Sequence, residues 1–220
     1  MLRYRKGIQP VELTALQSTP GSTWGSVGHD IKAAVRQALV RDQGALCAYC
    51  ERRITGEDDE RGRPRMKVEH WRAQSSSAEG LRWRNMLGVC LGGTDVPGGE
   101  LHCDSSRGNA PLFLHPIEGE GPDPIDHLSY TAGGEVRART GHPDVDRDLR
   151  ALNLNAAVLR RGRQAVYDEL RARLERDGFT VAALRRAAQA SRAGSGPPRP
   201  EFAEFVSYHV RRWLRKRGAA

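Results

Sequence analysis

The 220-residue chain is 38% hydrophobic and 28% charged, which suits one domain with an extension, or two small domains, around a modest core. No apolar run approaches the ~20 residues that a bilayer-spanning helix needs, so we expect no contact with a membrane. The formal net charge is +8, and the excess lies from Val145 onward, where 17 basic residues face 8 acidic ones. A basic region favours a phosphate backbone or an acidic protein surface, but heavy use of arginine explains the charge equally well, since only four of the 35 basic residues are lysines.

The predicted elements begin with residues 1–27, which are rich in Pro, Gly, Ser and Thr and which we expect to form an extended arm. An apolar stripe of helical period predicts a helix over 30–43 that ends at a glycine. Residues 66–71 alternate weakly and predict a strand. Residues 81–89 predict a short helix leading to the third cysteine, and 105–110 another helical turn.

The remainder predicts one hairpin and then helices. Residues 128–139 have the pattern of two short strands around a Gly-Gly turn. Helices are expected at 155–177, capped by its first residue Asn155, at 181–193, and at 201–217, with a break at 194–198. The fold class is therefore α+β, with an arm at 1–27, a domain at 28–142 and a basic helical region at 143–220.

The four cysteines are the strongest signal in the sequence. Cys47 and Cys50 form a Cys-x-x-Cys knuckle, whose two thiolates reach one tetrahedral ion from a tight turn. Cys90 and Cys103 are separated by a glycine-rich segment that is able to loop out and bring them together. The start of the chain does not resemble a signal peptide, so we expect a cytoplasmic protein, in which reduced thiols favour metal over disulfides. We expect all four thiolates to hold one structural Zn²⁺; the alternative is a redox Cys-x-x-Cys with two unrelated cysteines.

Between the two cysteine pairs lies a Glu-His dipeptide, Glu69-His70, followed by Asn85. On a regular strand the Glu69 and His70 side chains leave on opposite faces, unless the strand ends or bends there. Taken alone such a dipeptide is usually a solvated surface pair. Its position between the two cysteine pairs is what makes it a candidate site.

This order resembles the zinc-bearing branch of the HNH nuclease family, which has Cys-x-x-Cys, Asp/Glu-His on a strand, an Asn, and a second cysteine pair leading into a helix. The resemblance covers residues 47–109 and implies a ββα-metal (His-Me finger) fold. The family frequently ends in Cys-His-x-x-Lys, whereas this chain has Asp104 where that His would be and Arg107 where the Lys would be.

A wider pattern is similar to the PtuB nucleases, which accompany an ATPase, PtuA, in the Septu and retron antiphage systems. It comprises Cys-Ala-Tyr-Cys-Glu, Trp-x-Asn-Met-Leu, His-Cys-Asp-x-x-Arg-Gly and a later Leu-Asn-Leu-Asn before Arg-rich helices. This likeness implies an antiphage nuclease, with a PtuA-like ATPase as its partner.

The resemblance implies a role for each candidate residue. His70 would be the general base, because its pKa lies near neutrality, and Asn85 would orient His70 or the attacking water. Glu69 and Asp104 would bind a catalytic Mg²⁺ or Mn²⁺ through oxygen atoms. Arg107 would contact a nucleic-acid phosphate.

Two of these assignments keep alternatives. His102 is a neighbour of the zinc site, a zinc ligand, or a replacement for Asp104, and Asp104 itself is alternatively a helix cap. The expected activity is hydrolysis of a phosphodiester bond in DNA, with RNA such as tRNA also open. The alternative is a zinc-stabilised nucleic-acid-binding or ATPase-docking module without catalytic activity.

Overall fold

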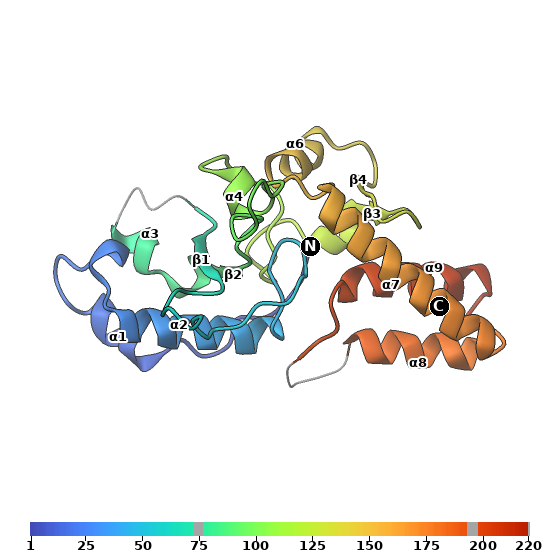
Figure 1. Cartoon of the computed structure of the whole chain (residues 1–220), viewed down its shortest axis with the longest axis horizontal. Helices are drawn as coiled ribbons and strands as arrows, with labels where there is room; N and C mark the ends of the chain where they lie inside the picture. Colours follow the sequence, from blue (N-terminus) through green and yellow to red (C-terminus); the bar gives the residue numbers. More distant parts are fainter. Residues whose placement is uncertain (73–76, 193–197, 220) are drawn as a thin grey trace.

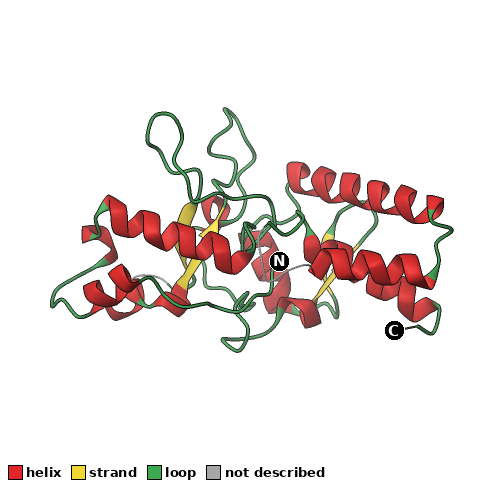
Figure 2. Cartoon of the chain, turned by 90° about the horizontal axis from the view of Figure 1, so that it is seen from below, coloured by secondary structure: helices red, strands yellow, loops and turns green. Residues whose placement is uncertain are grey.

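The structure is a computed structural model that describes residues 1–72, 77–192 and 198–219. It is elongated: the elements up to β2 lie at one end, α7, α8 and α9 at the other, and α4, α6 and the β3–β4 hairpin between them (Figure 1). Strands are short, and most of the chain is helix or loop (Figure 2). The expected mixture of helices with a small amount of sheet is confirmed.

The N-terminal part is built around helix α2, His29–Gln43, which confirms the helix expected at 30–43. Gly44 ends it in the left-handed conformation, with φ +62°, which a residue without Cβ adopts at little cost. Val35 and Leu39 are fully buried against the sheet side of the core. This helix therefore anchors the turn that begins at Ala45 and carries the first two cysteines.

Strand β1, Lys67–His70, pairs antiparallel with β2, Met86–Val89, and His70 lies opposite Met86. The helix predicted over 81–89 is wrong: helix α3, Ser77–Leu81, and the 3₁₀ turn η2, Trp83–Asn85, precede a strand. The physical reason is burial on both faces, because every residue of β2 is buried and its pattern carries no single apolar stripe. The Gln43 side chain also bonds both the N–H and the C=O of Gly88, which holds β2 against α2.

The first 27 residues do not form an extended arm. Leu2 and Tyr4 are buried, and the Tyr4 N–H donates to the Pro116 carbonyl. Helix α1, Val11–Gln17, and the 3₁₀ turn η1, Trp24–Ser26, follow. Apolar residues lie among the Pro, Gly, Ser and Thr of this segment, and they pack it against the core. This packing is a tertiary effect, so the local composition does not indicate it.

After the short helices α4, Asp104–Arg107, and α5, Pro124–His127, the chain forms the predicted hairpin. Strand β3, Leu128–Tyr130, pairs with β4, Val136–Ala138. Helix α6, Pro143–Ala151, was not predicted; its proline occupies the first helical position, where a missing N–H costs nothing.

Three helices complete the described chain: α7, Ala157–Arg176, α8, Val181–Arg192, and α9, Ala203–Lys216. Asn155 does not cap α7; its side chain bonds the N–H and C=O of Val136. Glu100 Oε2 accepts from the Ala157 N–H instead, which ties α7 to the loop between Cys90 and Cys103. The break expected at 194–198 lies, apart from its last residue, outside the described residues.

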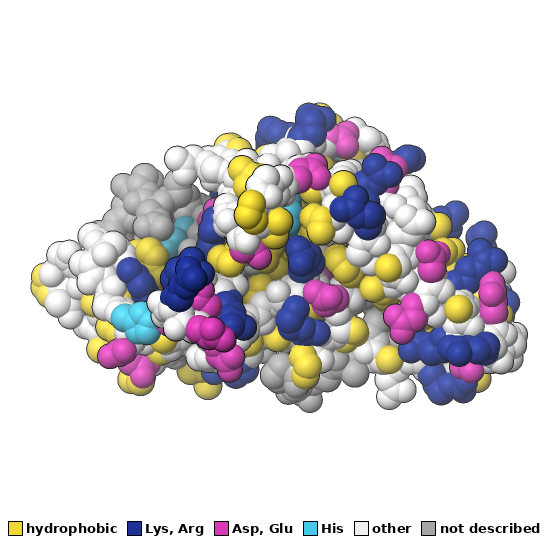
Figure 3. Space-filling model, viewed as in Figure 1, with side chains coloured by type: hydrophobic (Ala, Val, Ile, Leu, Met, Phe, Trp, Pro, Cys, Tyr) yellow, Lys and Arg dark blue, Asp and Glu magenta, His cyan; other side chains and the backbone are white. Residues whose placement is uncertain are grey.

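Lys and Arg side chains gather over the C-terminal helices, with acidic side chains between them (Figure 3). Within the described ranges, none of the helices combines the length and the apolar character that a bilayer crossing demands. The domain limits after residues 27 and 142 stay a prediction.

Candidate functional site

The four cysteines converge, as expected. The Sγ atoms of Cys47 and Cys103 are 3.9 Å apart, those of Cys50 and Cys90 are 3.7 Å apart, and all four lie within 4.8 Å of one another. A tetrahedral ion with Zn–S bonds of about 2.3 Å separates its sulfurs by about 3.8 Å. The side chains are buried and their sulfurs are too far apart for disulfides, so the cluster fits a structural zinc ion.

The chemistry of the cluster also favours a cation. Burial raises the pKa of the Cys50 and Cys103 thiols, and the other three thiols raise that of Cys103 further. Four buried sulfurs this close are unable to ionise together without a cation, and a bound divalent metal removes that penalty. Among the described residues, this is the one group of three or more potential metal ligands that comes together.

His102 lies against the sulfurs. Its Nδ1 is 3.3 Å from Cys103 Sγ and 3.9 Å from Cys90 Sγ, and the residue is fully buried. An imidazole N–H in this place stabilises a thiolate by hydrogen bonding. Of the three roles considered for His102, the geometry favours that of a neighbour of the zinc site over a replacement for Asp104.

Glu69 and Asp104 form a carboxyl pair beside the cluster. Asp104 directly follows Cys103, so the cysteine cluster fixes the position at which α4 begins. Burial, together with a hydrogen bond to Asp104, raises the pKa of Glu69 to about 8, although Arg107 acts to lower it. Two carboxyl groups in a partly buried place offer hard oxygen ligands to a divalent cation.

Both carboxyl groups already face cations of the chain. Lys67 Nζ lies 3.1 Å from Asp104 Oδ2, and Arg107 Nη1 is in close contact with Glu69 Oε1. Tyr49, in the middle of the cysteine knuckle, donates its hydroxyl to Glu69 Oε1 at 3.3 Å. The sequence reasoning missed Tyr49 and Lys67; the position of Tyr49 between two predicted zinc ligands was the signal available.

Arg107 is buried, with 3% of its side chain exposed. Besides Glu69, its guanidinium donates to the Tyr49 hydroxyl and to backbone carbonyls of His70, Trp71 and Ala110. The expected phosphate contact stays a prediction, and it would require this guanidinium to leave partners that already use its donors. What the structure does show is that Arg107 joins α4 to the end of β1.

His70 leaves β1 on the face opposite Glu69. Its Nε2 lies 2.8 Å from the Gly80 carbonyl, and its ring packs edge-on to Trp24 of η1 at 5.4 Å. A carbonyl only accepts, so Nε2 carries the proton and Nδ1 is the basic nitrogen. Burial lowers the pKa of His70, which keeps the ring neutral at pH 7.

Asn85 holds the segment that follows His70. Its Oδ1 accepts from the Arg72 N–H at 2.7 Å, and its Nδ2 donates to the carbonyls of Arg72 and Glu79. The predicted residues thus fall into two groups at one strand end, the Glu69–Asp104 pair on one face and His70 with Asn85 on the other. Their catalytic roles stay predictions.

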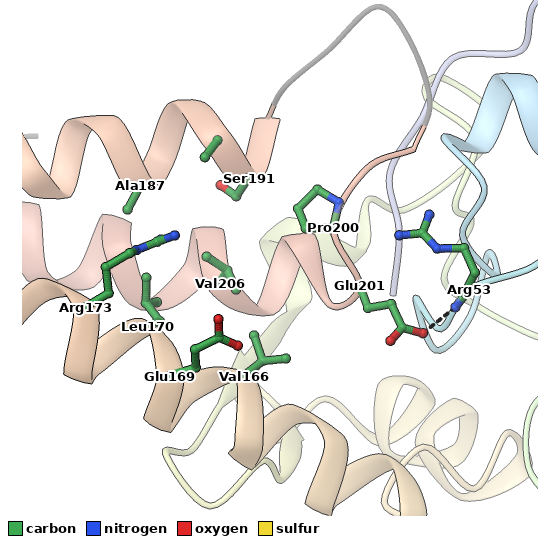
Figure 4. A pocket seen from close by; sticks show the side chains of 11 residues that line it. Arg53, Val166, Glu169, Leu170, Arg173, Ala187, Ser191, Pro200, Glu201 and Val206 are labelled. Atoms are coloured by element: carbon green, nitrogen blue, oxygen red, sulfur yellow. Dashed lines mark hydrogen bonds between the residues drawn. The ribbon is translucent and has the colours of Figure 1, made fainter.

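A separate hollow of 390 Å³ lies between α7, α8 and α9 and touches Arg53 from the N-terminal part (Figure 4). Its floor is apolar, formed by Val166, Leu170 and Val206, while the Arg53 N–H donates to Glu201 at its edge. None of the predicted site residues lines it, so the candidate chemistry lies elsewhere.

Comparison with known proteins bears on the relationship to HNH endonucleases. No family model matches the chain. A stretch of 103 residues is 35% identical to the Escherichia coli protein named "Retron Ec83 putative HNH endonuclease". The predicted resemblance to HNH endonucleases is confirmed. The match covers 40% of this chain, and the chain spans 38% of that relative's length.

Proposed function

We propose that this chain is an HNH-type endonuclease that hydrolyses nucleic-acid phosphodiester bonds with the help of a divalent metal ion. One observation carries the proposal: at the end of β1, the Glu69–Asp104 carboxyl pair lies beside a four-cysteine cluster on one face, and the hydrogen-bonded His70 lies on the other. The similarity to a retron HNH endonuclease supports it. We assign residues 28–142 to a ββα-metal fold on the basis of β1, β2 and α4 in that order.

His70 serves as the general base. The Gly80 carbonyl fixes its tautomer, so Nδ1 accepts a proton from the attacking water. Asn85 acts as a positioning residue, because its amide bonds the carbonyl of Glu79, which directly precedes Gly80, and the carbonyl of Arg72, two residues after His70. Burial keeps the imidazole unprotonated, and activity should fall as the pH drops through the lowered pKa, below 6.5.

Glu69 and Asp104 would hold a Mg²⁺ or Mn²⁺ ion, which would stabilise the negative charge that develops on the phosphate. For this to happen Glu69 must give up its proton and Lys67 must yield its place on Asp104. The zinc ion is structural, because four thiolates leave no ligand position open for substrate.

DNA is the proposed substrate, with RNA such as tRNA as the other possibility to test. The word "Retron" in the relative's name supports a place in an antiphage system. We propose a PtuA-like ATPase as partner, with the basic C-terminal region as the part that contacts it or the nucleic acid. Co-expression with an ATPase encoded beside the gene tests this; failure to co-purify would contradict the partnership and leave the nuclease proposal standing.

A second candidate function is a zinc-stabilised binding module without catalysis. The observation that favours it is that Lys67 and Arg107 already neutralise both carboxyl groups. In this case the ion pairs are the final state of the site, and no divalent ion displaces them.

A plasmid-cleavage assay with Mg²⁺ or Mn²⁺ separates the two functions. Endonuclease function predicts that His70→Ala and Asp104→Asn abolish cleavage, whereas His29→Ala, at an exposed histidine, cleaves like the parent. Cleavage that survives both active-site substitutions would refute the assigned roles. A parent protein that binds DNA and never cuts it, with either metal, would establish the binding module.

A further inference from the structure

Next to Asn85 the structure has a group of arginines that the assigned chemistry does not use. Arg72, Arg82 and Arg84 line one small hollow together with Trp71, His115 and Glu120. We propose that Arg72 and Arg82 form a phosphate-binding edge that grips the nucleic-acid backbone beside the scissile bond. This inference rests on the proposed nuclease function and adds to it the surface that holds the substrate.

Arg72 is fixed close to the candidate base. It lies two residues after His70, and the Asn85 side chain bonds both its N–H, at 2.7 Å, and its carbonyl, at 3.0 Å. The backbone carbonyl of Asn85 also accepts a hydrogen bond from the Trp71 N–H at 2.9 Å. The backbone that carries Arg72 is therefore held to the strand end that carries His70.

The guanidinium of Arg72 is exposed, and its one recorded contact is with the Trp71 ring, 5.9 Å from the ring centroid. Within residues 1–72, 77–192 and 198–219, no hydrogen bond or ion pair engages that guanidinium. Its five N–H donors are thus available to an anion, and a planar fork of this kind suits two oxygens of one phosphate.

Arg82 and Arg84 differ in how many of their guanidinium donors are already hydrogen-bonded. Arg84 is in close contact with Glu120 and donates to the Glu118 carbonyl. Arg82 reaches Glu79 and Glu120 only at 3.6 and 3.7 Å, beyond hydrogen-bonding distance, and its side chain is 45% exposed. Glu120 therefore positions Arg84, while Arg82 keeps donors for a second phosphate contact.

The floor beneath these arginines is rigid and uncharged. The His115 ring is buried and packs against Trp71 at 4.4 Å, and the Trp71 indole N–H donates to the Leu114 carbonyl. Burial lowers the pKa of His115 to about 4, and the surrounding arginines lower it further while Glu120 acts to raise it, so the ring adds no positive charge at neutral pH. The positive charge of the edge at neutral pH thus comes from its arginines.

The ligand chemistry is that of a phosphodiester backbone, which duplex DNA, single-stranded DNA and RNA share. Such contacts release counterions, so each lost contact reduces the slope of log K against log salt by about 0.9 for duplex DNA and about 0.7 for single strands. A purely structural arginine changes stability and leaves this slope unchanged. The slope therefore distinguishes the proposed role from support of the fold.

The test uses the full chain with zinc bound and His70→Ala as the background, to prevent cleavage. Fluorescence anisotropy would follow binding of a labelled 30-base-pair duplex, and of the matching DNA and RNA strands, between 50 and 250 mM salt. We expect Arg72→Ala and Arg82→Ala each to reduce the slope by one phosphate contact. Arg72→Lys should keep the slope, and Arg61→Ala, at an exposed arginine on the 57–65 loop, should match the parent.

The outcomes separate this proposal from the one that it rests on. Binding by the parent with unchanged slopes in Arg72→Ala and Arg82→Ala, at unchanged zinc content and melting temperature, would overturn the phosphate-binding edge alone. Should either variant fail to fold, Arg72→Gln and Arg82→Gln repeat the measurement with the size of the side chain retained. A parent chain that binds none of the three nucleic acids would overturn the proposed function as well.

Discussion

Replacing Arg107 with Met tests whether this arginine supports the site from within. Its side chain is 3% exposed, and its guanidinium contacts Glu69, the Tyr49 hydroxyl and the carbonyls of His70, Trp71 and Ala110. Methionine fills similar space and removes every donor. The variant leaves three backbone carbonyls and a carboxyl group without their partner.

Each buried acceptor left without its donor costs about 1–3 kcal/mol, so removal of the guanidinium should cost about 4 kcal/mol or more. For a chain of this size each kcal/mol lowers the melting temperature by about 2–4 °C, so we expect a fall of roughly 10 °C. Arg171→Met is the matched control, because Arg171 pairs with Glu175 on the exposed face of α7. An exposed pair contributes about 0–1 kcal/mol.

Urea unfolding at pH 7, with zinc bound in every sample, measures both variants. A free energy of unfolding for Arg107→Met within 1 kcal/mol of that for Arg171→Met would refute the structural role. It would also favour the predicted contact of Arg107 with a phosphate, because a guanidinium that does not stabilise the fold is able to turn toward substrate.

Three further predictions follow from single features. The raised pKa of Glu69, about 8 against 4.5 in the unfolded chain, means that its contribution to stability is fully present below about pH 4.5 and is lost as the pH rises to about 8. Glu69→Gln should flatten this dependence in urea unfolding without Mg²⁺, and an unchanged slope would count against the raised pKa of Glu69. Cys103→Ser, or a strong chelator, should reduce the zinc content from one ion per chain and unfold the N-terminal part, measured by metal analysis and near-ultraviolet circular dichroism; full zinc occupancy would contradict the four-thiolate site. Gly134→Ala should lower the free energy of unfolding by at least about 2 kcal/mol, because φ is +78° and a Cβ would lie 2.1 Å from the Arg160 carbonyl oxygen. In the control Gly133→Ala the new Cβ meets nothing closer than 3.8 Å, and the cost should be below about 1 kcal/mol.

The sequence predicted the features that depend on local pattern or on unusual residue types. The chain has four cysteines, and a metal ion bound by all four accounts for them together. Their convergence follows from the Cys-x-x-Cys knuckle and from the glycine-rich loop between the last two. The 29–43 helix and the β3–β4 hairpin carry their period and their turn in consecutive residues. The relationship to an HNH endonuclease was likewise readable from the motif order.

Tertiary structure alone decided the rest. Residues 86–89 form a strand because β1 supplies hydrogen-bond partners on one side and the Gln43 side chain bonds Gly88. The residue pattern of 86–89 does not indicate either contact. Arg107 is buried because Glu69 and four other acceptors converge on it from segments far apart in the chain. A charged side chain looks the same in a sequence whether it meets solvent, substrate or a buried carboxylate, and only the packing around it determines which.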